Sequence, residues 1–198
     1  AELYVGIAKD SADPATQRRR WLDAARVYEE ELDALSDALE AALRAFAVDL
    51  DDPEILDEAD RLAEKGNLWE RLGQVYETLV RQADDAPRKV ELLLRHAQLL
   101  DERSGDPSGA LDQTLRACSL APDDDAVLAL AEARAPRAGR AAELLITYDT
   151  RKTAAESDTG RVEALLRAAR LCEAELRDRQ RAVHYLAQAV ALGVRAPE

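Results

Sequence analysis

The sequence predicts an all-α fold, a solenoid of about eleven helices arranged as antiparallel hairpins. Composition is the first observation, because 39 alanines and 30 leucines among 198 residues favour helices over a large sheet. The second observation is an internal repeat with a period of 72 residues. The third is apolar spacing typical of amphipathic helices. Together they predict a repeat protein rather than a compact mixed domain.

The repeat runs through the chain without gaps. Residues from Arg88 align with residues from Gly160 at an offset of 72, so that Leu93–Leu94–Arg95 recurs as Leu165–Leu166–Arg167. Small and aromatic residues form columns at the same offset. These columns are Ala25, Ala97 and Ala169; Ala38, Ala110 and Ala182; Ala45, Ala117 and Ala189; and Tyr4, Tyr76 and Tyr148.

Each 72-residue unit divides into a longer and a shorter hairpin. We expect one array over 1–198, with units at about 15–86 and 87–158, a partial unit at 159–198, and 1–14 as the end of a preceding unit. A solenoid needs polar capping repeats at its ends, and neither end of this sequence has one. We therefore expect a piece of a longer array.

Helices are expected between clusters of turn residues. The first apolar stripe contains Trp21, Ala25 and Tyr28 at helical spacing. Proline in a first helical turn after aspartate, as in Asp52–Pro53 and Asp106–Pro107, indicates a helix start. The expected helices lie near 1–10, 15–33, 35–49, 53–65, 68–83, 87–104, 107–120, 124–135, 138–156, 159–177 and 179–193.

These spacings resemble the tetratricopeptide repeat (TPR). The family pattern places a bulky, a small and an aromatic residue in the first helix, as in Trp21, Ala25 and Tyr28, and small residues in the second helix. The shorter hairpins depart from the pattern, since Asp60 and Glu132 occupy the small place of their first helices. The resemblance implies a right-handed superhelix. The pattern is nearly as similar to the half-a-TPR repeat and to other α-solenoid families.

The resemblance also implies a binding surface, because in TPR proteins the first helices line a concave groove. Carried over by motif, a protein-binding surface would include Arg19, Leu22, Arg26, Glu29, Asp57, Arg61, Leu94, Gln98, Asp101, Leu166, Arg170 and Glu173. The arginines among them favour a partner segment with acidic and apolar residues. A solvated helical face with internal ion pairs is the competing interpretation. Some TPR proteins bind the terminal carboxylate of a peptide through side chains on these helices. The resemblance disfavours that mode here, because leucines occupy one of the positions that it requires.

Residues that could carry chemistry are few and scattered. His96 and His184 lie in different repeats and have no metal-binding spacing. We interpret Cys118 and Cys172 as buried core residues without a disulfide. Asp49, Asp51 and Asp52 do not have calcium-loop spacing, and we interpret the run 123–125 as a helix start. We therefore expect no enzyme activity, no cofactor and no metal.

The net charge of −13 argues against nucleic acid as a partner, and no apolar run is long enough to insert into a membrane. We expect a non-enzymatic scaffold that binds a peptide or partner protein on its concave face. The open alternatives are a regulatory or sensor segment of a larger protein, a self-associating structural array and, less favoured, an RNA-binding helical repeat. The residue bias is typical of a G+C-rich bacterial genome. A cytoplasmic location is favoured over a secreted one, although the sequence does not determine it.

Overall fold

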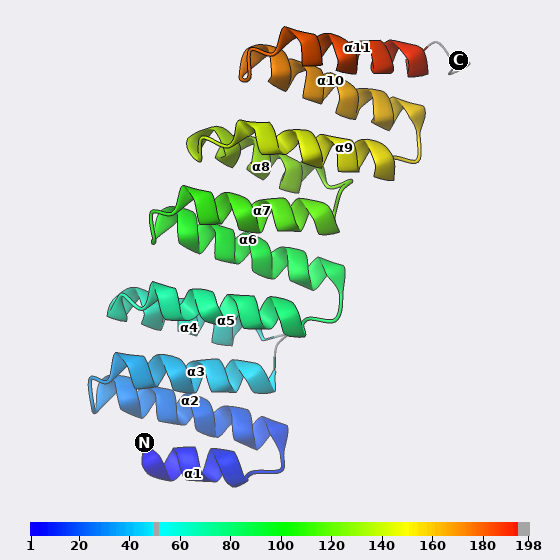
Figure 1. Ribbon diagram of the computed structural model, residues 1–198. Coiled ribbons are helices and arrows are strands. Elements are labelled where there is room, and N and C mark those ends of the chain that lie inside the picture. Colours follow the sequence, from blue (N-terminus) through cyan, green and yellow to red (C-terminus); the bar gives the residue numbers. More distant parts are fainter. Residues whose placement is uncertain (50–51, 194–198) are drawn as a thin grey trace. The chain divides into compact units, whose positions relative to one another are not determined.

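The computed structural model describes residues 1–49 and 52–193, and it divides the chain into two compact units, Ala1–Leu79 and Val80–Glu198. Within the described residues every regular element is helical (Figure 1). The helices are α1 (Glu2–Asp10), α2 (Pro14–Glu30), α3 (Leu35–Val48), α4 (Pro53–Gly66), α5 (Trp69–Gln82), α6 (Ala86–Glu102), α7 (Pro107–Leu120), α8 (Asp125–Arg137), α9 (Leu144–Ala154), α10 (Asp158–Ala174) and α11 (Arg179–Gly193). The predicted all-α fold of helical hairpins is confirmed.

Each unit is a stack of consecutive helices. In the first unit α1 packs against α2, α2 against α3, and α3 against α4. In the second unit α6 packs against α7, α7 against both α8 and α9, α9 against α10, and α10 against α11. The long hairpins α2–α3, α6–α7 and α10–α11 are visible in Figure 1 as closely paired antiparallel helices. The expectation of one continuous array over 1–198 stays a prediction.

The alanine columns form the contacts within the long hairpins. All nine alanines of the three columns are buried: Ala25, Ala38, Ala45, Ala97, Ala110, Ala117, Ala169, Ala182 and Ala189. A methyl side chain lets two helix axes approach to the short end of the usual 8–10 Å range. Larger side chains such as Trp21 and Phe46 are also buried and fill the space beside these alanines.

Helix starts follow the predicted aspartate and proline signals. The side chain of Asp106 accepts a hydrogen bond from the Gly109 amide at 2.9 Å, ahead of Pro107 in the first turn of α7. Such a cap satisfies an amide that has no partner within the helix. Side-chain caps also begin six other helices, at Asp13, Asp52, Asp85, Asp124, Ser157 and Asp178, and the first three of these are likewise followed by proline in the first turn.

One predicted helix is wrong at its start. The sequence pattern predicted a single helix over 138–156, whereas the chain forms a 3-10 turn at Ala141–Glu143 before α9. The cause is the end of α8, where Gly139 adopts φ +69°. The Arg140 amide then bonds to the Ala135 carbonyl, and the Gly139 amide bonds to the Pro136 carbonyl. This pair of bonds is a Schellman ending, which turns the chain out of the helical direction.

The column position Ala97 offers a test of the packing. We expect Ala97→Leu to lower the free energy of unfolding by about 1–3 kcal/mol, because Ala97 is 0% exposed and a larger side chain would overpack the α6–α7 contact. Denaturant unfolding of the 198-residue chain measures this change. The matched control is Ala129→Leu, an exposed alanine on α8, which should change stability by less than about 0.5 kcal/mol. Equal effects of the two substitutions would contradict the proposed register.

Candidate functional site

An open groove of about 510 Å³ lies in the second unit, lined by α8, the start of α9, and α10. Its apolar lining residues are Pro136, Leu144, Leu166, Leu171 and Ala174. Its polar lining residues are Glu132, Tyr148, Glu163, Arg167, Arg170 and Glu175. The groove therefore combines an apolar floor with a charged rim, which is the usual composition of a protein site for small molecules or peptide side chains.

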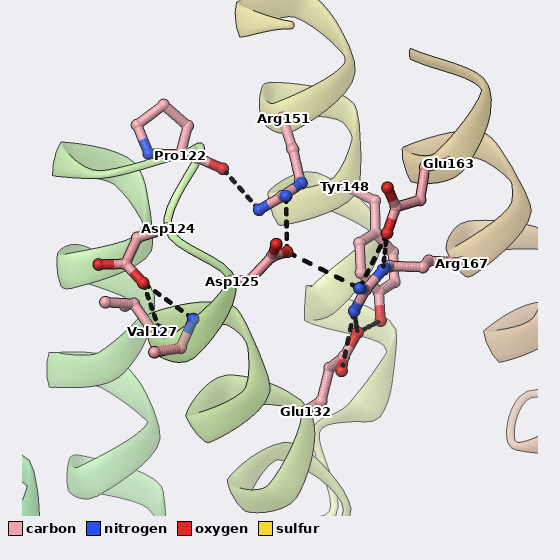
Figure 2. Close-up of polar contacts among 10 residues, drawn as sticks. Pro122, Asp124, Asp125, Val127, Glu132, Tyr148, Arg151, Glu163 and Arg167 are labelled. Atoms are coloured by element: carbon pink, nitrogen blue, oxygen red, sulfur yellow. Dashed lines mark hydrogen bonds and ion pairs between the residues drawn. The ribbon is translucent and has the colours of Figure 1, made fainter. Parts of the chain in front are cut away.

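Arg167 holds one wall of the groove together (Figure 2). Its guanidinium nitrogens lie 3.1 Å from Glu132 Oε1 and 3.0 Å from Glu163 Oε1. A longer ion pair of 3.7 Å joins it to Asp125, which also accepts a 2.7 Å hydrogen bond from Arg151. Desolvation tends to lower the pKa of Arg167, but the hydrogen bonds to Glu163 and Glu132 outweigh it, and the pKa is raised. Arg167 is thus engaged with several acids of the chain itself.

Tyr148 completes this wall from α9. Its hydroxyl donates a 2.7 Å hydrogen bond to Glu132 Oε1, and burial, followed by this acceptor, raises the pKa of Tyr148. The first unit contains the same pair at the 72-residue offset, since the Tyr76 hydroxyl donates to Asp60 at 3.0 Å. The acids that break the TPR pattern in the shorter hairpins are therefore hydrogen-bond acceptors for a buried tyrosine.

Arg170 lies one turn after Arg167 on α10, and its surroundings are different. It lines the groove, its side chain is exposed, and it makes no hydrogen bond or ion pair within the described part of the chain. Leu166 lies half-buried on the same face. Two residues of the predicted surface, Leu166 and Arg170, thus lie at the groove that the structure forms.

All the predicted surface residues lie on the expected first helices and are exposed or half-buried. Those of the first unit are Arg19, Leu22, Arg26 and Glu29 on α2 and Asp57 and Arg61 on α4. Those of the second unit are Leu94, Gln98 and Asp101 on α6 and Leu166, Arg170 and Glu173 on α10. Their role in binding stays a prediction.

Arg61 is engaged in contacts that the sequence did not indicate. Its Nη1 donates to Glu29 Oε1 at 2.8 Å, and its Nη2 and Nε donate to Glu58 at 2.7 Å. Lys65 adds a 2.9 Å bond to Glu29. The side chain of Glu29 is only 10% exposed, and the hydrogen bond from Arg61 is the main reason why its pKa is lowered to about 2. Arg61 is therefore paired with acids of the chain itself, as the competing interpretation expects. One of these acids, Glu58, is on the same helix, and the other, Glu29, joins α4 to α2.

A matching ion pair exists in the second unit. Asp101 on α6 accepts two hydrogen bonds from Arg137 on α8, at 2.7 and 2.8 Å. Asp101 and Arg137 stand 72 residues after Glu29 and Lys65. Both acids therefore connect a long hairpin to the first helix of the next hairpin. The signal that could have found them is an acid and a base, 36 residues apart, recurring together at the repeat offset.

The remaining candidate residues have structural surroundings. Cys118 and Cys172 are buried free thiols, and burial raises the pKa of Cys118 to about 11. His96 is buried on α6, while His184 lies exposed on α11, 2.7 Å from Gln188. Among the described residues no group of three or more His, Cys, Asp or Glu side chains could hold a metal ion.

The acidic runs also have roles in the fold. Asp49 and Asp52 both accept from Arg18 Nη1, at 2.8 and 2.7 Å, while Asp51 lies outside the described residues. Asp124 caps α8 by accepting from the Ala126 and Val127 amides, which confirms the helix start predicted at the run 123–125 (Figure 2).

Comparisons with known proteins add solved structures of similar fold. No family model matches the chain, and no curated protein matches it. A TPR protein named YrrB, described as having an unusual peptide-binding site, shares 17% identity at a TM-score of 0.41, with 98% of this chain and 94% of that chain covered. PilF of Pseudomonas aeruginosa shares 15% identity at a TM-score of 0.38, with 98% and 90% covered. Both likenesses are too distant to transfer residue roles to this chain.

The ion pair at Glu29 predicts how stability depends on pH. We expect Glu29→Gln to lower the free energy of unfolding at pH 7 by about 1 kcal/mol, because Arg61 and Lys65 lose their shared acceptor. A carboxyl with a lowered folded-state pKa stabilises the fold above its ordinary value of 4.5 and loses this effect as the pH falls towards about 2.

The difference between wild type and variant should therefore shrink between these pH values, as followed by denaturant unfolding at each pH. Glu30→Gln is the control, since Glu30 is an exposed neighbour on the same helix. A pH-independent difference for Glu29→Gln would contradict the ion-pair explanation.

Proposed function

We propose that the protein is a non-enzymatic interaction module whose second unit binds a short peptide segment or helix in the α8–α10 groove. The observation that carries this proposal is the pairing, in one groove, of an apolar floor with the free guanidinium of Arg170. A volume of about 510 Å³ accommodates a few side chains of a partner segment. Helical-repeat grooves suit such extended or helical partners.

The chemistry of the rim favours a partner with a carboxylate beside an apolar residue. An apolar side chain would lie against Leu166, Leu171 and Leu144, because burying it there removes apolar surface from water. A carboxylate would reach Arg170, whose planar guanidinium can donate two parallel hydrogen bonds. Arg167 does not compete for the ligand, since Glu132 and Glu163 occupy its donors.

The polar groups of the groove support binding rather than catalysis. Tyr148 is tied to Glu132, and its pKa is raised, so its hydroxyl keeps its proton. Glu132 and Glu163 are both paired with Arg167. These groups stiffen the wall against which a ligand can rest. In addition, none of the helices in the described part of the chain has the length and apolar character that spanning a membrane requires.

Arg170→Glu tests the groove. Peptides selected from a random library on the wild-type chain should carry an acidic residue near an apolar one, and the Arg170→Glu chain should bind them at least about tenfold more weakly. Reversing the charge removes the forked donor and adds repulsion. Titration by fluorescence anisotropy measures the dissociation constants.

Arg116→Glu is the matched control, because it makes the same charge change at an exposed position of α7 outside the groove. It should leave the dissociation constants within about twofold, while circular dichroism verifies that each variant is folded. If the selected peptides lack acidic residues, or bind both variants equally, the groove is not the binding site.

A further inference from the structure

The exposed face of α11 carries a row of apolar side chains. Val183, Leu186 and Val190 are 64%, 42% and 64% exposed, and their spacing of three and four residues places them on one side of the helix. We call these three residues the α11 stripe. On its other side α11 packs against α10 through buried residues such as Ala182 and Ala189. The stripe is therefore separate from the α8–α10 groove.

The internal repeat shows what this row does in an earlier copy. At the 72-residue offset, the α11 stripe corresponds to Leu111, Thr114 and Cys118 on α7, which are all buried. Thr114 accepts a 2.9 Å hydrogen bond from Arg134 of α8, and the Cys118 thiol lies 3.7 Å from the Val127 carbonyl of α8. In α7, the equivalent row is thus the contact with the next first helix.

The first unit repeats this arrangement. The corresponding residues of α3 are Leu39, Ala42 and Phe46, each 0% exposed, and α3 packs against α4. The covering helices α4 and α8 share an amphipathic pattern. Their buried positions are Ile55, Leu56, Ala59, Leu62 and Ala63 in α4, and Val127, Leu128, Ala131 and Ala135 in α8. The two copies therefore specify the kind of element that fits this face.

The charges beside the stripe differ from those in the earlier copies. Glu40 of α3 pairs with Arg71 at 2.6 Å, and Asp112 of α7 pairs with Arg140 at 2.7 Å, so each acid faces an arginine of the following hairpin. The corresponding residue of α11 is His184, and α11 contains no acidic residue between Arg179 and Gly193. Arg71 lies on α5 and Arg140 follows α8, so these two arginines are outside the covering helices themselves. What α11 offers to a covering helix is basic side chains, Arg179 and Arg181, without any acid, which favours an acidic partner.

We propose that the α11 stripe is a second docking surface, which binds an acidic amphipathic helix with the apolar spacing of α4. The apolar contact follows the α3–α4 and α7–α8 contacts, and the acidic character follows from the basic residues of α11, which has no acid of its own. This is a helix-in-groove type of recognition in which anchors at helical spacing enter an apolar face. It does not depend on ligand binding at Arg170.

A labelled peptide with the sequence of residues 52–67 is a suitable probe, because it contains the apolar pattern of α4 and carries six acids against two bases. Anisotropy titration with the 198-residue chain should show saturable binding with a dissociation constant below about 1 mM. The triple variant Val183→Glu, Leu186→Glu, Val190→Glu should bind at least about tenfold more weakly. Ile146→Glu is the matched control, since Ile146 is 71% exposed on α9, and it should bind as wild type does.

The charge part is tested by His184→Glu, which restores the acid found in α3 and α7 and should weaken binding of the acidic peptide at least about threefold. His184→Gln should have a smaller effect. Flat titrations with the wild type, or equal binding by the triple variant, would overturn the docking surface. Equal binding by His184→Glu would overturn the acidic preference. Sedimentation that shows wild-type dimers and a monomeric triple variant would assign the stripe to a second copy of the chain instead.

Discussion

The second helix of each long hairpin has two apolar faces, and its own hairpin can bury only one of them. The alanine columns close the inner face, where Ala110 and Ala117 of α7 meet α6. The outer face, with Leu111 and Cys118, is buried only because α8 and α9 lie against α7. Burying a leucine side chain such as that of Leu111 is worth about 1.5–3 kcal/mol. Stacking of neighbouring hairpins is therefore a condition for the fold rather than a consequence of it.

The polar contacts between hairpins follow the same repeat, but they are less uniform than the apolar columns. Glu29 pairs with Lys65 and Asp101 pairs with Arg137 at equivalent positions, whereas Arg61 has alanine as its counterpart at position 133. A surface ion pair contributes little and tolerates exchange, while a buried alanine at a helix contact does not. Differences in charge between the copies can therefore give them different roles. Arg170 of α10 is an example, because its counterpart on α6 is the neutral Gln98.

Most of the fold could be predicted from the sequence because its signals are local. The pair Asp106–Pro107 begins α7 as expected, since the cap and the fixed proline φ act within one turn. The start of α9 could not be predicted, because the Schellman ending at Gly139 depends on backbone bonds that helical periodicity does not reveal. The same limit applies to Glu132, whose acceptance of the Tyr148 hydroxyl joins two helices across a turn.

The candidate site could be predicted only to the level of a helix face. The TPR resemblance indicated the face of α10 that carries Leu166 and Arg170, and both residues line the groove. It could not distinguish Arg170 from Arg61, because both are arginines on a first helix and their difference lies in their neighbours. Arg61 stands within reach of Glu29 and Glu58, whereas no acid of the described residues pairs with Arg170. The acids around an arginine thus decide whether it is available for a ligand. Some of these acids belong to other helices, so the structure is needed to identify them.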